Sequence, residues 1–301
     1  MRTAMLFPGQ GAQRAGMLAA LPRHDAVVST LAEASDVLNR DWRELDRQDT
    51  LASTEATQLA LLIAGVAASR ALLAESARID AVLGHSVGAY PAAVTAGCLS
   101  FPDALKLVAL RGSLMASIHP SGFGMAAIVG LRQQVVAELV DAAAGPIYLA
   151  NRNAPLQTVV SGSDAALEAV CARALEIGAS KAERLTVTTP SHSPLVAPVA
   201  DALREAVRSV EFHVPRLAYA SSRSARLLND AAAIAEDLAC NVAEPVLWDD
   251  AVAMLVERGA SVFLQAPPGT VLADLVTQAH PAVRVYVLEG GTLGSAVHLT
   301  R

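Results

Sequence analysis

Short apolar runs alternate with longer segments of helical periodicity along most of the chain. Residues 3–7, 79–83, 217–220 and 261–265 have the length and apolar character of buried strands. Residues 51–74, 101–116, 193–207, 231–239 and 248–257 are predicted as helices, and Ser100 is expected to cap the second of them. Strands that alternate with helices favour a mainly parallel sheet with helices on its faces.

The middle of the chain follows a different order. Strands are predicted at 124–131, 147–151, 158–161 and 182–187, with a turn at 153–155 and helices at 132–144 and 163–178. The order β-α-β-β-α-β is that of a ferredoxin-like unit. We therefore expect an α/β fold in which an α/β-hydrolase-like, mainly parallel sheet domain, residues 1–122 and 189–301, carries an inserted ferredoxin-like subdomain, residues 123–188.

Composition narrows the possible partners and compartment. A chain of 301 residues with 53% hydrophobic side chains can bury a large core, and a net charge of −6 argues against nucleic acid. The three cysteines show no metal-ligand or disulfide spacing. The charge-free stretches 81–102 and 112–131 are interrupted by Gly, Pro and His, so neither is expected to span a membrane. We expect a soluble cytoplasmic protein.

The strongest local motif is Gly84-His85-Ser86-Val87-Gly88, between an apolar strand and a helix. G-x-S-x-G in this setting is the nucleophile elbow, whose sharp turn exposes the serine hydroxyl and needs small residues around it. The following helix directs free N–H groups towards an oxyanion. Pro91 falls inside that helix, so we expect the helix to be kinked or its first turn to be irregular.

A nucleophilic serine needs a base, and the chain has seven histidines. His85 adjoins the nucleophile, but neighbouring side chains diverge at such a turn, so we expect it to pack beneath the site. His192 lies in a predicted loop after the inserted subdomain, where catalytic groups are common. Position alone leaves two possibilities for His192, a catalytic base or a structural loop histidine.

Four motifs in order carry a family resemblance: residues 7–13 (Phe-Pro-Gly-Gln-Gly-Ala-Gln), the elbow at 84–88, Arg111-Gly112 and Pro190-Ser191-His192. Together they resemble the malonyl-CoA:acyl carrier protein transacylase family over nearly the whole chain. The resemblance implies an S-malonyltransferase that takes the malonyl group of malonyl-CoA onto the serine and passes it to an acyl carrier protein. Coenzyme A thioester is then a substrate, and no metal or redox cofactor is expected.

The resemblance also implies a role for each matching residue. Ser86 is the nucleophile and His192 the general base, while the backbone N–H groups of Gln10 and Val87 form the oxyanion hole. Arg111 binds the free carboxylate of the malonyl group, as suits a planar guanidinium. In the family a backbone carbonyl orients the histidine, and the matching position is assigned to Asn241.

One departure from the commonest family pattern points to a subtype. Members that serve fatty-acid synthesis usually have Glu-Tyr after the elbow, whereas this chain has Ala89-Tyr90, followed by Pro91. These features look more like the malonyl transferase (epsilon) subunit of malonate decarboxylase, whose acceptor is the acyl carrier subunit of that enzyme. A malonyl transacylase of fatty-acid synthesis remains the alternative.

Two other classes of function stay open. A serine thioesterase or esterase shares the elbow, although no acidic residue lies in an obvious position to orient His192 and a buried arginine suits an anionic acyl group. A non-catalytic subunit that only binds the carrier is the other. For carrier docking we expect a basic patch on the inserted subdomain, formed by Arg132, Arg152, Arg173, Lys181 and Arg184.

Overall fold

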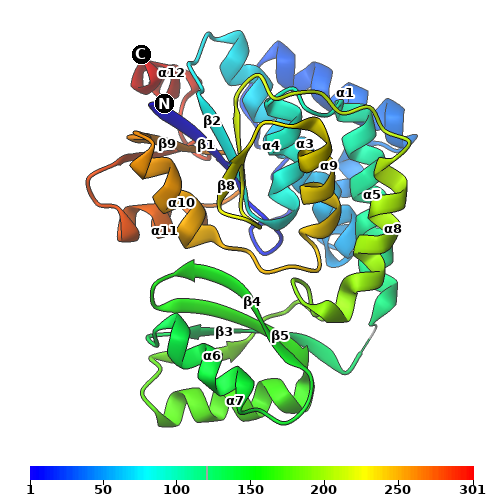
Figure 1. Ribbon diagram of the computed structural model, residues 1–301. Coiled ribbons are helices and arrows are strands. Elements are labelled where there is room, and N and C mark those ends of the chain that lie inside the picture. The colour runs from blue at the N-terminus through cyan, green and yellow to red at the C-terminus, as the bar shows by residue number, and fades with distance from the viewer. Residues whose placement is uncertain (120) are drawn as a thin grey trace.

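A computed structural model describes residues 1–119 and 121–301 and shows two β-sheets, one above the other in Figure 1. The larger sheet has the strand order β10-β9-β1-β2-β7-β8, and only β8 runs antiparallel to its neighbour. Its strands are β1 (Thr3–Phe7), β2 (Ala81–Gly84), β7 (Ala218–Ser221), β8 (Arg226–Leu228), β9 (Val262–Gln265) and β10 (Arg284–Val287).

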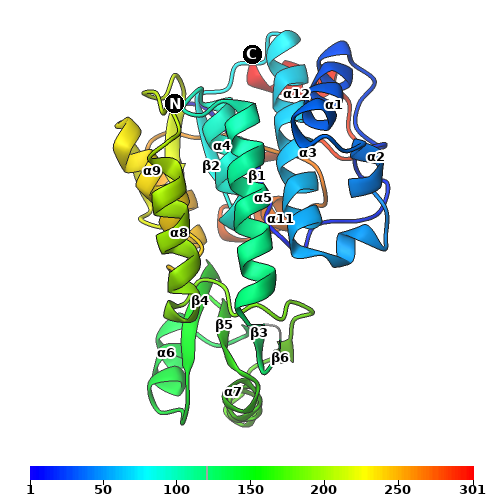
Figure 2. The same cartoon turned by 90° about the vertical axis from the view of Figure 1, so that its right-hand side faces the viewer.

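Helices cover both faces of the larger sheet, because the side chains of each central strand alternate between two cores. Met5 and Phe7 of β1 belong to the core that includes the helices α1 (Asp25–Leu38), α3 (Thr54–Ala74), α4 (Ala89–Thr95) and α5 (Phe101–Ile118). Ala4 and Leu6 face α10 (Trp248–Glu257) and α11 (Val271–Ala279). Figure 2 shows α3 and α5 side by side with α8 (Ala197–Val207) beyond them. The remaining helices are α2 (Trp42–Leu45), α9 (Ala231–Cys240) and α12 (Leu293–Thr300).

The smaller sheet is antiparallel, with the order β4-β5-β3-β6. It contains β3 (Phe123–Val129), β4 (Ile147–Ala154), β5 (Gln157–Ser163) and β6 (Lys181–Arg184), and α6 (Gln133–Asp141) and α7 (Asp164–Glu176) pack on one of its faces. Order and connections are those of the ferredoxin-like fold, so the predicted fold class is confirmed. These two sheets support the division that we propose, a large α/β domain at 1–122 and 189–301 and a small subdomain at 123–188.

Most predicted elements are present, with boundaries shifted by a few residues. Ser100 caps α5 by accepting a hydrogen bond from the Asp103 N–H, and Ser163 caps α7 in the same way through Ala166. The expected turn at 153–155 is displaced, because β4 continues to Ala154 and the chain turns at 155–156. Six elements were not predicted, namely α1, α2, β8, α11, β10 and α12.

Helix α3 is the one described helix that is long and apolar enough to cross a membrane. Its most apolar stretch is 89% buried inside the protein, between α1, α5 and the sheet. Its length and composition are those of a central core helix, which is surrounded by protein instead of lipid.

Candidate active site

The G-x-S-x-G motif forms a tight turn at the carboxyl end of β2. Ser86 has a φ of 55°, in the left-handed region that non-glycine residues rarely occupy. A Cβ at Gly84 would overlap the backbone of Gly88, and a Cβ at Gly88 would overlap the Phe7 carbonyl, so both positions require glycine. The turn is therefore strained at the half-buried serine, as a nucleophile elbow requires.

The irregular first turn expected after the elbow is confirmed. Residues Ser86–Gly88 form a 3₁₀ turn, and α4 starts only at Ala89. Pro91 is the third residue of α4, where a backbone N–H would have no partner inside the helix. The proline therefore costs no helical hydrogen bond, and its ring packs against Gly65 of α3.

His192 lies directly beside the serine. Its Nε2 is 2.8 Å from Ser86 Oγ, and its Nδ1 is 3.0 Å from the carbonyl oxygen of Glu244. The residue is buried and has a φ of 60°. Because a carbonyl can only accept, Nδ1 carries the proton and Nε2 is free to accept the hydrogen bond from the serine hydroxyl. The arrangement is that of a nucleophile with its general base.

The surroundings of His192 disfavour its charged form. Burial lowers its pKa to about 3, and the positive charge of Arg111 and the neighbouring His85 act in the same direction. The carbonyl groups of Glu244 and Asn241 oppose this shift, since they favour the protonated ring. Without substrate, His192 is therefore neutral at physiological pH and has its Nε2 lone pair available.

The expected role of Asn241 requires a correction. The carbonyl that accepts the Nδ1 hydrogen bond belongs to Glu244, three residues further along the chain. Asn241 does lie in the site: its carbonyl is near enough to favour the protonated form of His192, and its side-chain Oδ1 is 3.5 Å from Arg111 Nη2. The chain turns irregularly between α9 and α10, so the spacing in the sequence could not indicate which of its carbonyls would face His192.

Arg111 projects from α5 into the same site and is completely buried. Nη1 donates to Gln58 Oε1 at 2.6 Å and Nη2 donates to Ser86 Oγ at 3.1 Å, while Nε has no partner among the described residues. Within the described part of the chain, no carboxylate forms an ion pair with this guanidinium. Burial lowers its pKa to about 10, so it remains charged. A buried cation without an anion is a ready partner for an anionic ligand.

Two predicted backbone donors flank the serine. Gln10 lies in the loop after β1, which packs on the elbow so closely that a Cβ at Gly9 would come within 2.6 Å of the His85 carbonyl. Val87 directly follows Ser86. Across residues 1–119 and 121–301, neither Gln10 N nor Val87 N donates a hydrogen bond within the chain. Gln10 also reaches the arginine cluster, since its Oε1 is 3.4 Å from Gln58 Nε2.

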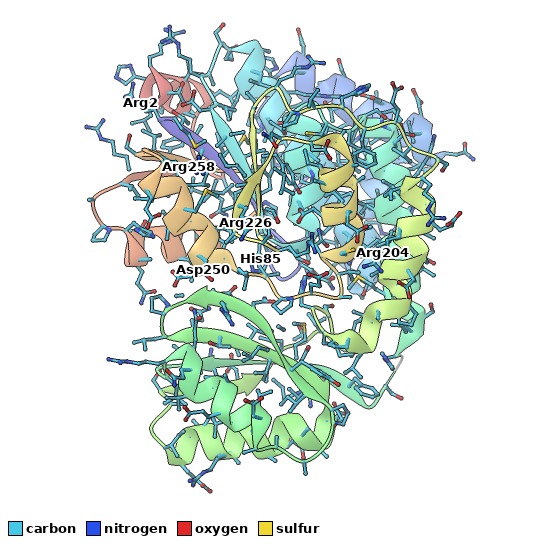
Figure 3. The ribbon with its side chains drawn as sticks, viewed as in Figure 1. Arg2, His85, Arg204, Arg226, Asp250 and Arg258 are labelled. Atoms are coloured by element: carbon cyan, nitrogen blue, oxygen red, sulfur yellow. The ribbon has the colours of Figure 1, made fainter. Side chains whose placement is uncertain are left out.

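His85 does not pack beneath the nucleophile as expected. Its half-buried ring points to the small subdomain, where Nε2 is 3.1 Å from Asn153 Oδ1, and it stacks obliquely on Trp248. Figure 3 shows it at the level where the two sheets face each other. Here it lines a pocket of about 220 Å³ whose wall also includes Gln10 and Asn153. Burial lowers the pKa of His85, which keeps this ring neutral as well.

Two residues of the site were not predicted from the sequence. Gln58, in the first half of α3, holds Arg111, and Glu244 holds His192 through its main chain. A polar residue inside the apolar stretch of 51–74 was a signal for Gln58, because a buried amide needs partners. No signal marked Glu244, since its side chain takes no part in the contact.

Comparison with known proteins agrees with this geometry. A family model described as the acyl transferase domain matches residues 4–289. The malonyl CoA-acyl carrier protein transacylase of Haemophilus influenzae is 36% identical over 281 residues, which cover 90% of each chain. The Escherichia coli K12 protein of the same name is 35% identical over 280 residues, covering 90% of this chain and 91% of that one.

Solved structures give the same result. The malonyl CoA-acyl carrier protein transacylase of Coxiella burnetii superposes with a TM-score of 0.94 at 33% identity, covering 100% of this chain and 97% of that one. A malonyl-transacylase in complex with a type II PKS acyl-carrier protein gives a TM-score of 0.95 at 34% identity, with 99% and 100% covered. The fold and the matching family model are those of an acyl transferase domain. More narrowly, the chain belongs to the malonyl CoA-acyl carrier protein transacylase family.

Proposed function

We propose that this protein moves a malonyl group from malonyl-CoA to the thiol of an acyl carrier protein, through a malonyl ester on Ser86. One observation carries the proposal: a buried, charged arginine without a carboxylate partner lies 3.1 Å from a serine that is hydrogen-bonded to a neutral histidine. A malonyl thioester offers a carboxylate for the first group and a carbonyl for the second. The names of the relatives support the same substrate and acceptor.

In the first half-reaction the Ser86 hydroxyl attacks the thioester carbonyl while His192 Nε2 takes its proton. The N–H groups of Gln10 and Val87 would stabilise the oxyanion of the tetrahedral intermediate. The C–S bond then breaks, and the coenzyme A thiolate leaves with the proton from His192. The second half-reaction is the reverse, with the carrier thiol as nucleophile and Ser86 as leaving group.

Substrate binding would also strengthen the base. Burial is the main cause of the low pKa of His192, and the second cause is the charge of Arg111. A malonyl carboxylate bound to Arg111 would neutralise that charge, which raises the basicity of His192 when the substrate is in place. An uncharged acyl group would leave the histidine as weak a base as in the free enzyme.

The test follows the acyl group by mass. Incubation with malonyl-CoA should add one malonyl group to the Ser86 peptide, and addition of a carrier protein bearing its thiol should remove it and malonylate the carrier. Ser86→Ala is the control and should acquire no adduct. Release of free malonate without any acceptor, at the rate of transfer, would instead identify a thioesterase. A wild-type protein that forms no adduct would identify a non-catalytic subunit.

The metabolic role has two candidates, distinguished by the acceptor. The relatives described above bear the transacylase name, which supports a general malonyl transacylase such as serves fatty-acid synthesis. Ala89 and Pro91 after the elbow favour the malonate decarboxylase role. Comparing kcat/KM for a fatty-acid-synthesis carrier with that for the carrier subunit of malonate decarboxylase decides between them. A preference of tenfold or more for the latter, about 1.4 kcal/mol, would establish the decarboxylase role.

A further inference from the structure

The loop between α9 and α10, residues 241–247, holds the histidine of the site through its main chain. The Val242 carbonyl accepts the His192 backbone N–H at 2.7 Å, and the Glu244 carbonyl accepts from Nδ1 at 3.0 Å. The loop has no regular secondary structure around Glu244. Backbone hydrogen bonds to β4 hold Val246, two residues further on, but Glu244 itself lies outside any helix or strand, so its carbonyl needs further contacts to fix it.

The Glu244 side chain supplies such a contact. Both of its carboxylate oxygens accept from Arg223 Nη1, at 3.0 and 2.9 Å. Arg223 in turn donates from Nε to Oδ1 of Asp237, at 3.1 Å. One guanidinium thus bridges the carboxylate of the loop and a carboxylate at the end of α9.

Asp237 is a rigid attachment point. Its side chain is 2% exposed, and it accepts hydrogen bonds from Ser221 Oγ at 2.5 Å and Tyr219 Oη at 3.0 Å, both on β7. A buried carboxylate with three donors has little freedom to move. Asp237, Arg223 and Glu244 therefore connect the central sheet to the loop that holds His192.

From this chain of contacts we infer that Arg223 is a positioning residue for His192: by tying the Glu244 side chain to Asp237, it fixes the Glu244 carbonyl against Nδ1. The inference rests on the proposed function, in which His192 is the base. A carbonyl held at hydrogen-bond distance keeps the proton on Nδ1 and the Nε2 lone pair on the serine. When the contact between Glu244 and Arg223 is removed, the Glu244 carbonyl remains but its position is no longer fixed. A small misplacement at a reacting centre slows catalysis strongly.

The sharpest variant is Glu244→Ala. It removes the carboxylate but keeps the backbone carbonyl, and it leaves the buried Asp237 paired with Arg223. We expect the single-turnover rate of Ser86 malonylation to fall by about tenfold to a hundredfold, with an unchanged KM for malonyl-CoA. Glu244→Gln can still accept from Arg223 through its amide oxygen and should recover most of the rate.

Two further variants separate positioning from stability. Malonylation of Ser86 should be at least as slow in Arg223→Ala as in Glu244→Ala. The double variant should be no slower than Arg223→Ala alone, because both substitutions remove the same connection between Glu244 and Asp237. Arg204→Ala is the matched control, since Arg204 bridges Asp201 and Glu236 on α8 and α9 without touching the site. Its rate should equal that of the wild type.

A spectroscopic readout isolates the histidine. In protein labelled with ¹⁵N-histidine, the Nδ1–H signal of His192 should shift or broaden in Glu244→Ala and remain in place in Glu244→Gln and Arg204→Ala. A Glu244→Ala protein that is folded, acylates at the wild-type rate and keeps the signal unchanged would overturn the inference. If the wild type forms no malonyl adduct, the proposed function fails. The ¹⁵N signal then still tests whether Arg223 and Glu244 position the His192 ring.

Discussion

At the scale of single residues, the distinguishing feature of the site is that Arg111 has no carboxylate partner among the described residues. Most buried arginines are paired with carboxylates, yet this one bonds neutral amides and the hydroxyl of Ser86. Desolvation makes such a cation unfavourable unless a ligand neutralises it. In the function that we propose, this unpaired charge would bind an anionic acyl group and discriminate against neutral ones.

Arg111→Ala should change acyl selectivity. The variant loses the attraction to malonyl and also the cost of leaving a desolvated guanidinium unpaired when acetyl binds, about 2–5 kcal/mol. We expect a steep fall in malonyl transfer and a rise in acetyl transfer relative to malonyl. Single-turnover acylation with malonyl-CoA and acetyl-CoA on both proteins measures the ratio. An unchanged ratio would make Arg111 a structural residue.

His192 should make the protein sensitive to acid. Its pKa falls from 6.5 to about 3 on folding, chiefly through burial, so between these values the unfolded chain binds more protons than the folded one. Stability contributed by the neutral ring is complete above pH 6.5 and is lost as the pH falls towards 3. At pH 5 the loss from this one group is about 2 kcal/mol.

Denaturant unfolding of wild type and His192→Gln, at pH 7 and pH 5, isolates this contribution. Other groups that titrate in the window, His85 included, are present in both proteins, so the difference between them reports on position 192. The free energy of unfolding should fall by about 2 kcal/mol less in the variant than in the wild type. Equal losses in the two proteins would mean that His192 is not buried in its neutral form.

At the scale of secondary-structure elements, the sequence predicted the helices and strands whose hydrophobic pattern follows from packing against the core. Strand β1 is fully buried, and both its bounds were predicted, because an apolar run that ends in Pro-Gly has one interpretation. Strands β8 and β10 were missed, since they are short edge strands with exposed or half-buried side chains and no alternation. Helix α1 was missed although Asp25 and an αL C-cap at Asn39 mark its ends, because its N-cap is a histidine.

The residues of the site divide in the same way, into those that a sequence pattern indicated and those that none did. The elbow could be located from its local motif, and His192 and Arg111 from the family resemblance, and Ser86, His192 and Arg111 do meet in space. The contact between His192 and Glu244 could not be predicted. It depends on the main-chain path of an irregular loop, which leaves no mark on residue type.

The elbow turn gives a prediction at this scale. In Gly84→Ala the new methyl would collide with the backbone of Gly88 and Ala89, which cannot move without displacing Ser86. We expect a destabilisation of about 1–3 kcal/mol and loss of the malonyl adduct. Gly294→Ala is the control, because its position in α12 is open and alanine favours helix. Thermal unfolding and adduct formation measure both effects, and a fully active Gly84→Ala protein would contradict the tight turn.

At the scale of the whole molecule, the loop between α9 and α10 links the small subdomain to the site. Val246 pairs with β4 through hydrogen bonds to Ala150 O and from Arg152 N, both at 2.8 Å. The same loop carries the Glu244 carbonyl that holds His192. Together with the bond between His85 and Asn153, this fixes the small sheet opposite the elbow, and the pocket lined by His85 and Asn153 lies between the two sheets.

The basic patch expected on the small subdomain carries little net charge. Four of its five cations have an acidic partner within 4.0 Å, and only Arg132 forms no ion pair with any residue in the described ranges. The pairs are Arg152 with Asp250, Arg173 with Glu176, Lys181 with Glu183 and Arg184 with Asp164. Five positive and four negative groups leave a net charge of +1, on a protein whose total is −6.

Such a surface cannot steer an acidic carrier strongly, so transfer should depend weakly on salt. A neutral encounter surface lacks the long-range attraction that ions screen. We expect kcat/KM for the carrier to fall by less than about threefold between 0.05 and 0.5 M salt, and Arg173→Ala to match the wild type. Stopped-flow transfer from preformed malonyl-Ser86 measures this without interference from the phosphates of coenzyme A. A tenfold or steeper fall would require a basic docking surface elsewhere on the molecule, because Arg132 alone supplies one unpaired charge and a single charge cannot produce that slope.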